Sequence, residues 1–291
     1  MGGGHHCWWP LFLPGLQRLQ PQGRGAPAPA GDRPRRLGGP WGSPRKENHQ
    51  GSAGGRTTVF RIFGDESCTH SGEFRVQGAL WVKQGLIASV RRELASVRRY
   101  RTGGGPAEIK WSEVRGRRLR PRVKALVDLF FTSSAASAMH FNTIIISHKD
   151  DPSRRAGASQ LSLSKAWHLL FRYRLWPNSD NYIDLDERPG WTAGHDYTLR
   201  SILNRTGCRS QSTVGLLRSV QSCSDDLIQL TDLLVGATAW EWNGRSQGSG
   251  AKAQLHEHIC HRLHCSTLLR ETIRHPKFDR WRYRPDAQRA A

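Results

Sequence analysis

From about residue 58 onward, hydrophobic and polar positions follow two different periods along the chain. Runs that are apolar throughout, or apolar at every second position, predict strands at 59–67, 74–82, 141–147, 181–187 and 212–220. Apolar residues that recur every three or four positions predict helices at 86–100, 120–137, 161–175, 195–205, 225–242 and 251–264. Two strands joined by a short loop, followed by strands that alternate with helices, indicate an α/β fold with a mixed sheet.

The first 57 residues lack this periodicity. Residues 1–58 hold 13 Gly and 8 Pro, a composition that buries too little apolar surface to offset chain entropy. We expect a disordered leader over 1–57, a folded domain over 58–270 and a basic tail over 271–291. The leader is either a basic nucleic-acid-binding arm or upstream sequence included by an early start codon, and the abrupt start of order at Thr57 favours the second.

The charge of the chain indicates its class of partner. Lys and Arg number 44 against 24 Asp and Glu, which gives a formal net charge of +20. Such a chain attracts polyanions, with nucleic acid the first candidate and an anionic membrane the second. No apolar run is long enough to span a bilayer, and six scattered cysteines are typical of reduced thiols, so a cytoplasmic protein is expected.

Carboxylates fall at the ends of several predicted strands. Asp65 and Glu66 close the first strand in the stretch FGDES, and Glu108 follows a glycine-rich loop. Asp184 and Asp186 share one face of the strand YIDLD, because alternate side chains of a strand point the same way. Acids at strand ends from different parts of a sheet are expected to converge at one edge.

The predicted helix 225–242 carries a polar face among its leucines. Gln229, Asp232 and Gly236 are spaced at i, i+3 and i+7, so they lie on one side of the helix. An acid and an amide beside a glycine mark a place where another backbone could approach.

Clustered carboxylates raise one another's pKa and oppose folding unless a cation compensates them. Mg²⁺ prefers oxygen ligands, and two such ions about 4 Å apart promote phosphodiester hydrolysis. The acids therefore predict a metal site within a basic surface that gathers a polyanion. Taken singly, each acid also has a structural interpretation: Asp65 as a turn cap, Glu108 as a solvent-facing helix start, and Asp225 and Asp226 as first-turn acids.

Four short stretches together resemble a known family. GDES after the first strand, EIKW after a loop, a strand ending in DLDER, and QLTDLLVGA on a late helix resemble the domain-of-unknown-function family numbered 3800. Its members look like ribonuclease-H-like proteins with an N-terminal DE pair and a C-terminal QxxD motif. The resemblance covers about residues 58–265. In one departure, Cys68 stands where the first motif commonly continues into glycine.

The resemblance implies a ribonuclease-H-like fold, a mixed sheet flanked by helices, and a Mg²⁺- or Mn²⁺-dependent nuclease that acts on DNA or RNA. The implied catalytic metal ligands are Asp65, Glu108, Asp186 and Asp232. Glu66, Asp184 and Gln229 would be alternate ligands or would support the ligands. Lys110 and Lys252 would contact phosphate or, as an equal alternative, be solvated surface lysines.

Other kinds of function have weaker support. The stretch HEHICHRLHC places His256, Cys260 and His264 on one helical face, but its outer pair lies about 12 Å apart, too far for one zinc ion. His256 and Cys260 could bind zinc only with ligands from elsewhere, so a structural role is favoured. The chain contains neither a GxSxG elbow nor a P-loop. The alternative from a different class is a non-catalytic module on the same fold that binds nucleic acid or protein.

Overall fold

The computed structural model describes residues 57–68, 72–98, 108–150, 159–206, 212–244 and 249–284. The chain divides into two units, Met1–Ala53 and Gly54–Ala291, and the architecture below belongs to the second unit. The leader expected over 1–57 lies outside the described residues, which begin at Thr57.

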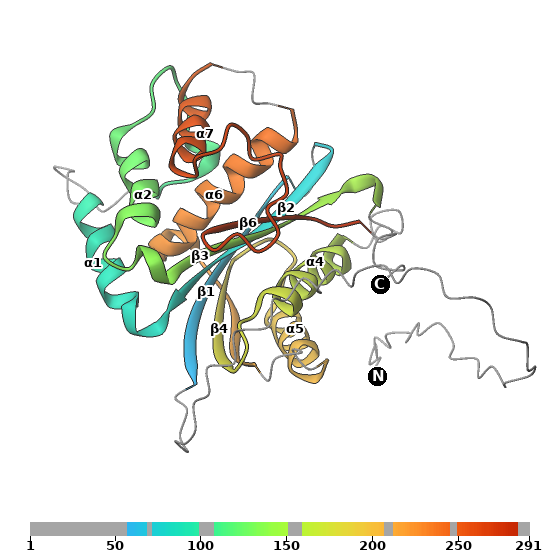
Figure 1. Ribbon diagram of the computed structural model, residues 1–291. Helices are drawn as coiled ribbons and strands as arrows, with labels where there is room; N and C mark the ends of the chain where they lie inside the picture. The colour runs from blue at the N-terminus through green and yellow to red at the C-terminus, as the bar shows by residue number, and fades with distance from the viewer. Residues whose placement is uncertain are drawn as a thin grey trace, which may run out of the picture. The chain divides into compact units, whose positions relative to one another are not determined.

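A six-stranded sheet forms the centre of this second unit, in the order β5-β4-β1-β2-β3-β6 (Figure 1). The strands are β1 (Thr58–Ser67), β2 (Phe74–Lys83), β3 (Met139–Ser147), β4 (Ser179–Asp186), β5 (Thr213–Val220) and β6 (Phe278–Arg282). The pairs β1–β2 and β2–β3 are antiparallel, whereas β4 runs parallel to β1 and β5 runs parallel to β4. The sheet is therefore mixed, as predicted.

Helices cover both faces of this sheet (Figure 1). The α-helices are α1 (Ile87–Arg98), α2 (Pro121–Thr132), α4 (Ser159–Arg174), α5 (Ala193–Arg205), α6 (Asp226–Trp242) and α7 (Ala251–Arg262). Short 3-10 helices are η1 (Gln84–Leu86), η2 (Trp111–Glu113), η3 (Ala136–Ala138), η4 (His148–Asp150) and η5 (Ser222–Ser224). The helices α1, α2, α6 and α7 lie on one side and α4 and α5 on the other, which confirms the expected mixed sheet flanked by helices.

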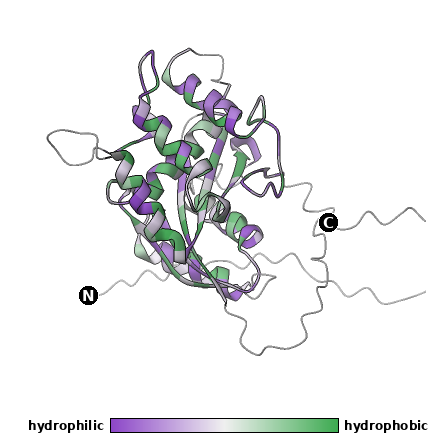
Figure 2. Cartoon of the chain, turned by 60° about the vertical axis from the view of Figure 1, so that its left-hand side comes forward, coloured by the Kyte–Doolittle hydropathy of each residue, from purple (hydrophilic) through white to green (hydrophobic). Residues whose placement is uncertain are grey.

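Each face of the sheet has its own hydrophobic core. Phe63, Leu80 and Phe130 belong to the core under α6, and Ile62 and Trp167 belong to the core under α4. The central strands are therefore buried on both sides, and every residue of β2 except Lys83 is buried. Along the helices, hydrophobic residues alternate with hydrophilic ones, as amphipathic elements require (Figure 2).

The C-terminal region differs from the expected basic tail. Residues 278–282 form β6, which pairs in parallel with β3 and extends the sheet at that edge. Phe278 supplies apolar burial, and the buried carboxylate of Asp279 is paired with Arg174 Nε at 2.6 Å. The stretch FDRWR carries charge at three of its five positions, so its sequence gives little strand signal.

None of the described helices is both long enough and apolar enough to cross a membrane.

Candidate functional site

Asp65 lies near the end of β1, on the sheet face that α6 covers. Its side chain is 6% exposed, and it stands opposite Gly78 of β2. A Cβ atom at Gly78 would come within 2.7 Å of Val235, so glycine allows α6 to approach the sheet closely. The hydroxyl of Thr231 donates to the carbonyl of Phe63 at 3.2 Å, which fixes the helix beside β1. This approach brings the polar face of α6 to Asp65.

The polar face of α6 holds the segment EIKW along the helix. Gln229 Oε1 accepts a hydrogen bond from the Ile109 amide at 2.8 Å, and Asp232 Oδ2 accepts one from the Trp111 amide at 2.5 Å. At Gly236 a Cβ atom would lie 2.2 Å from Trp111 Cγ, so only glycine admits the indole there. The face of α6 that carries Gln229, Asp232 and Gly236 thus contacts another backbone segment, as the sequence predicted.

Ser222 connects two further carboxylates at the end of β5. Its hydroxyl donates to Glu108 Oε1 at 2.6 Å, and its amide donates to Asp186 Oδ1 at 3.2 Å. The Ser222 carbonyl accepts from Gln229 Nε2 at 2.7 Å, which ties this turn to α6. Ser222 was missed in the sequence, where a serine within SVQSCS carries no distinguishing signal. Glu108 and Asp186 therefore face the same turn.

The electrostatics of the acids link them into one group. Burial, followed by the charges of Asp232, Glu66 and Asp186, raises the pKa of Asp65 well above its usual value. Burial raises the pKa of Asp232 to about 6, although the Trp111 amide and a hydrogen bond with Asp65 favour its charged form. The two buried carboxyls therefore influence each other's protonation.

Burial and a neighbouring carboxylate also affect Asp186. Burial raises the pKa of Asp186, and the charge of Glu108 raises it further, while Ser222 and Lys110 act in the opposite direction. Asp65, Glu108, Asp186 and Asp232 thus come from β1, the segment before η2, β4 and α6 and influence one another. Negative charge accumulates here without enough positive charge to balance it.

The donor set fits a hard divalent cation. All four side chains offer carboxylate oxygen, the ligand type that Mg²⁺ and Mn²⁺ prefer. Their spacing is open: among the described residues, the group of three ligand atoms that all lie within 4.8 Å of one another is found elsewhere, at Glu241, His256 and Cys260. Mg²⁺ is usually bound by one or two carboxylates and keeps several waters, so an open arrangement suits it.

Asp184 does not join this group. It shares a face of β4 with Asp186, but Arg61 Nη2 and Arg218 Nε contact its carboxylate, the latter at 2.7 Å. The side chain is 1% exposed, so these two guanidinium groups balance its buried charge. The expectation that Asp184 is an alternate metal ligand is corrected on this ground: its oxygens are occupied by arginine.

Glu66 is also held by an arginine. As the neighbour of Asp65 in β1 it points to the opposite face of the sheet, where Arg188 Nη1 lies 2.5 Å from its Oε2. Arg188 stacks on the ring of Trp191 at 3.8 Å from the ring centroid, which orients the guanidinium. Glu66 is therefore the ion-pair partner of Arg188, at the rim of the cleft that Arg188 lines, and its position is not that of a metal ligand.

Of the two lysines expected near phosphate, Lys110 lies beside the acids and Lys252 lies over the ring of Trp111. Lys110 Nζ is 3.2 Å from Glu108 Oε1, and its side chain is 41% exposed. Lys252 of α7 places its Nζ 5.1 Å from the ring centroid of Trp111, whose amide binds Asp232. Their contact with phosphate stays a prediction.

A cleft of about 430 Å³ opens beside the acids. Its lining residues are Glu108, Lys110, Asp186, Glu187, Arg188, Pro189, Gln221, Ser222 and Cys223. The cleft thus combines two of the carboxylates with two cationic side chains, Lys110 and Arg188. A phosphate group could enter between positive charges and reach the acids.

Cys68 occupies a backbone conformation that favours glycine. Its φ angle is 57°, in the left-handed region, directly after the strand that carries Asp65. Non-glycine residues adopt this region at a cost of about 1 kcal/mol or more. The cysteine that departs from the resembled motif therefore stands where glycine would be unstrained.

Comparisons with known proteins were made for the whole chain. No model of a protein family matches it, and no curated protein matches it. Among solved structures, ribonuclease H2 from Pyrococcus horikoshii OT3 is similar over 72% of this chain and 91% of its own, with 9% identity and a TM-score of 0.40. Bst-RNase HIII in complex with Mn²⁺ is similar over 72% of this chain and 63% of its own, with 14% identity and a TM-score of 0.34. Because these identities and TM-scores are low, the fold class is taken from the strand order described above and not from the two similar structures.

Proposed function

We propose that this protein is a metal-dependent nuclease of the ribonuclease-H-like type, which hydrolyses phosphodiester bonds of nucleic acid. One observation carries the proposal: four carboxylates from distant parts of the chain lie close enough at one edge of the sheet to influence one another, and the pKa values of Asp65 and Asp232 are raised there. Among the described residues no lysine or arginine forms an ion pair with either Asp65 or Asp232. A site that concentrates unbalanced charge in this way is suited to a divalent cation.

Asp65, Glu108, Asp186 and Asp232 would hold Mg²⁺ or Mn²⁺. When bound, such ions activate a water and stabilise the leaving oxygen of a phosphodiester. The protein's own contribution is to fix the ligands: the Trp111 amide orients Asp232, and Ser222 orients Glu108 and Asp186. Gln229 binds the Ile109 amide and the Ser222 carbonyl, so it ties the segment that carries Trp111 and the turn that carries Ser222 to α6 and is thus a positioning residue.

The substrate class follows from charge. Arg115, Arg117, Arg118 and Arg120 are exposed on the segment that directly follows Trp111 and the short helix η2. This segment, here called the arginine segment, is attached to α7, because Gln254 Nε2 donates to the Arg117 carbonyl and the Ala251 amide donates to the Gly116 carbonyl. A cationic strip that follows Trp111 in the chain and is fixed to α7 would bind the phosphates that flank the scissile bond.

We also propose membership of the domain-of-unknown-function family numbered 3800. The support comes from its two motifs: the DE pair supplies Asp65 to the acid group, and QxxD supplies Asp232 together with its supporting Gln229. Glu66, the second residue of the pair, would then act at the rim through Arg188.

The test is a set of incubations of the full chain and of Asp65→Asn with labelled DNA, RNA and RNA–DNA hybrid, each with Mg²⁺, Mn²⁺ or EDTA. We expect wild type to cut at least one substrate with a divalent cation, and neither with EDTA nor after Asp65→Asn. Retention of nucleic acid in EDTA without cleavage under any condition would instead support the binding module and refute the nuclease.

A further inference from the structure

A second group of metal-binding side chains lies at the far end of α6. Glu241 is the last but one residue of this helix, and His256 and Cys260 lie one turn apart on α7. One ligand atom from each lies within 4.8 Å of the other two. His256 Nε2 is 2.7 Å from Glu241 Oε2, and Cys260 Sγ is 3.6 Å from His256 Nε2. The third ligand that His256 and Cys260 lacked in the sequence is thus supplied by another helix.

The three side chains are buried: Glu241 is 6% exposed, His256 8% and Cys260 5%. A carboxylate, an imidazole and a thiol in an apolar core are costly unless each finds a partner. Glu241 is held from outside the group, since Thr267 Oγ1 and the Leu268 amide both donate to its carboxylate at 2.5 Å. Metal-binding carboxylates are commonly oriented by such hydrogen bonds.

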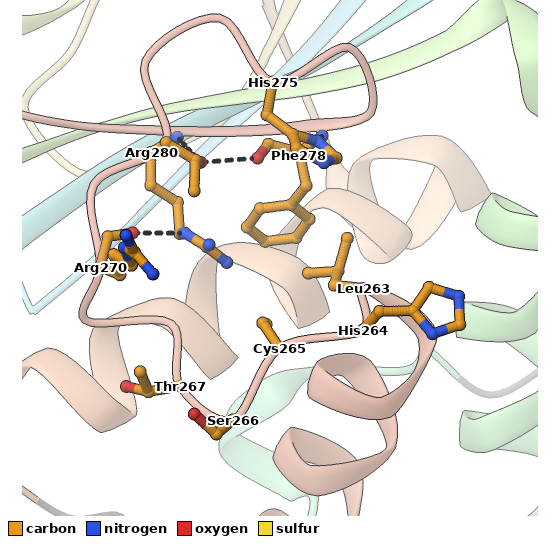
Figure 3. A pocket seen from close by; sticks show the side chains of 10 residues that line it. Leu263, His264, Cys265, Ser266, Thr267, Arg270, His275, Phe278 and Arg280 are labelled. Carbon is orange, nitrogen blue, oxygen red and sulfur yellow. Dashed lines mark hydrogen bonds between the residues drawn. The ribbon is translucent and has the colours of Figure 1, made fainter.

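The chain returns to the same place after α7. The Cys265 amide donates to the Cys260 carbonyl at 3.0 Å, which places Cys265 beside Cys260, although its thiol lies outside the group of three ligand atoms within 4.8 Å of one another. Cys265 also lines a cavity of about 530 Å³ between this segment and β6 (Figure 3). Two thiols, an imidazole and a carboxylate are therefore gathered from α6, α7 and the segment that follows α7.

A buried cation lies in the neighbouring cavity. The guanidinium of Arg280 points into it between Arg270 and Phe278 (Figure 3). Arg280 is 3% exposed, its Nε donates to the Arg270 carbonyl at 3.0 Å, and its Nη1 makes no hydrogen bond to any described residue. Two thiolates and a carboxylate around a divalent ion carry a net charge of −1, which a nearby guanidinium would balance.

We propose that Glu241, His256, Cys260 and Cys265 bind one zinc ion that ties the end of α6 to α7 and to the segment after it. Zinc takes sulfur, nitrogen and carboxylate ligands in a four-coordinate site, and a site with all four positions filled by protein is structural. Mg²⁺ does not favour sulfur, so this site and the carboxylate site select different ions. The two lie about 13 Å apart along α6, because Glu241 follows Asp232 by nine residues.

The experiment measures zinc by mass spectrometry in full-length protein that has been produced with zinc and then desalted. We expect one zinc per chain in wild type, and its loss in Cys260→Ser and in His256→Asn. The matched controls are His261→Asn, an exposed histidine of the same helix, and Cys68→Ser, a cysteine at the end of β1. Both controls should keep the ion. The double variant Asp65→Asn with Asp232→Asn should also keep it, which separates this site from the carboxylate site.

A second measurement applies to wild type alone, in case the ligand variants do not fold. Zinc-depleted protein that is titrated with Co²⁺ should develop thiolate-to-cobalt charge-transfer absorption and the visible bands of a tetrahedral ion. Folded wild type that holds no stoichiometric zinc after loading and gives no thiolate–cobalt absorption would overturn the proposal. Zinc retained by folded Cys260→Ser would overturn it as well.

Discussion

Asp184 and Asp186 stand two residues apart on one face of β4, yet they have different surroundings. Asp184 is neutralised by Arg61 and Arg218, whereas Asp186 faces Glu108 across Ser222. The alternation of the strand predicted that both would point the same way. It could not separate them, because the arginines come from β1 and β5 and reach Asp184 only through the register of three strands.

An uncompensated aspartate such as Asp232 and a neutralised one such as Asp184 should respond oppositely when asparagine replaces them: the first change should raise the free energy of unfolding and the second should lower it. The folded protein raises the pKa of Asp232 from 3.8 to about 6, so stability is lost as pH rises through that range. Asp232→Asn removes this penalty and keeps an acceptor for the Trp111 amide. In EDTA at pH 7 we expect it to raise the free energy of unfolding by about 1 to 3 kcal/mol, at 1.36 kcal/mol per pKa unit. At pH 4 the increase should be largely absent, and urea unfolding at both pH values checks it.

The same variant should lose cleavage activity by at least about a hundredfold, since metal ligands supply several kcal/mol of transition-state stabilisation. Asp184→Asn is the matched control. It leaves the partly buried guanidinium of Arg61 and the exposed one of Arg218 without a carboxylate and should lower the free energy of unfolding by about 1 to 3 kcal/mol, while folded protein keeps its cleavage activity. If both variants shift stability in the same direction, the assignment of the two aspartates is wrong.

Among the elements, α6 does the most to assemble the site. It approaches the sheet over Gly78, receives the segment EIKW on its polar face, and carries Asp232. Its amphipathic pattern and its start at Asp225, whose side chain caps the Leu227 amide, were readable in the sequence. Strand β6 was not predicted, because its burial depends on Arg174 pairing with Asp279 across the fold.

Gly236 tests this role of α6. Inside a helix, Gly→Ala normally stabilises by about 0.5 to 1 kcal/mol. Here the new methyl group would collide with Trp111, so Gly236→Ala should destabilise by about 1 to 3 kcal/mol and displace Glu108, with loss of cleavage. Thermal unfolding and the cleavage assay measure the two effects.

The matched control is Gly194→Ala in α5, where the nearest atom, Thr192 Oγ1, lies at an ordinary contact distance of 3.5 Å. It should leave cleavage unchanged and stability equal or higher. Full activity in Gly236→Ala would show that Trp111 does not need to pack against the helix for the site to form.

The whole molecule combines a strongly positive chain with a small group of uncompensated acids. The net charge of +20 predicted a polyanionic partner, and the positions of the acids at strand ends predicted their convergence. Which acids remain unbalanced was not predictable, since that depends on which arginines the fold brings to them. The raised pKa values of Asp65 and Asp232 likewise result from tertiary packing alone.

The arginine segment should set the salt dependence of nucleic-acid binding. Arg117→Glu with Arg118→Glu should weaken binding and reduce the slope of log K against log salt by about 0.7 to 0.9 for each phosphate that the protein no longer neutralises. Arg200→Glu with Arg205→Glu, on α5 at the other face of the sheet, makes the same charge change and should alter the slope less. Fluorescence anisotropy over a range of salt in EDTA measures both slopes. Equal slopes of log K against log salt for the two double variants would show that nucleic acid does not bind at the arginine segment.

Divalent cation should also stabilise the fold. An ion that binds only the folded protein at a hundred times its Kd adds about 2.7 kcal/mol, so Mg²⁺ should raise the unfolding midpoint at pH 7. The increase should disappear in Asp65→Asn and persist in Asp184→Asn. An increase that survives Asp65→Asn would indicate binding at another place.

The most direct test is anomalous diffraction from crystals of the full chain grown with saturating Mn²⁺. We predict an anomalous peak within coordination distance, about 2.2 Å, of carboxylate oxygens of Asp65 and Asp232. An ordered cleft without such a peak, with Asp65 and Asp232 still bonded to each other, would contradict the central claim.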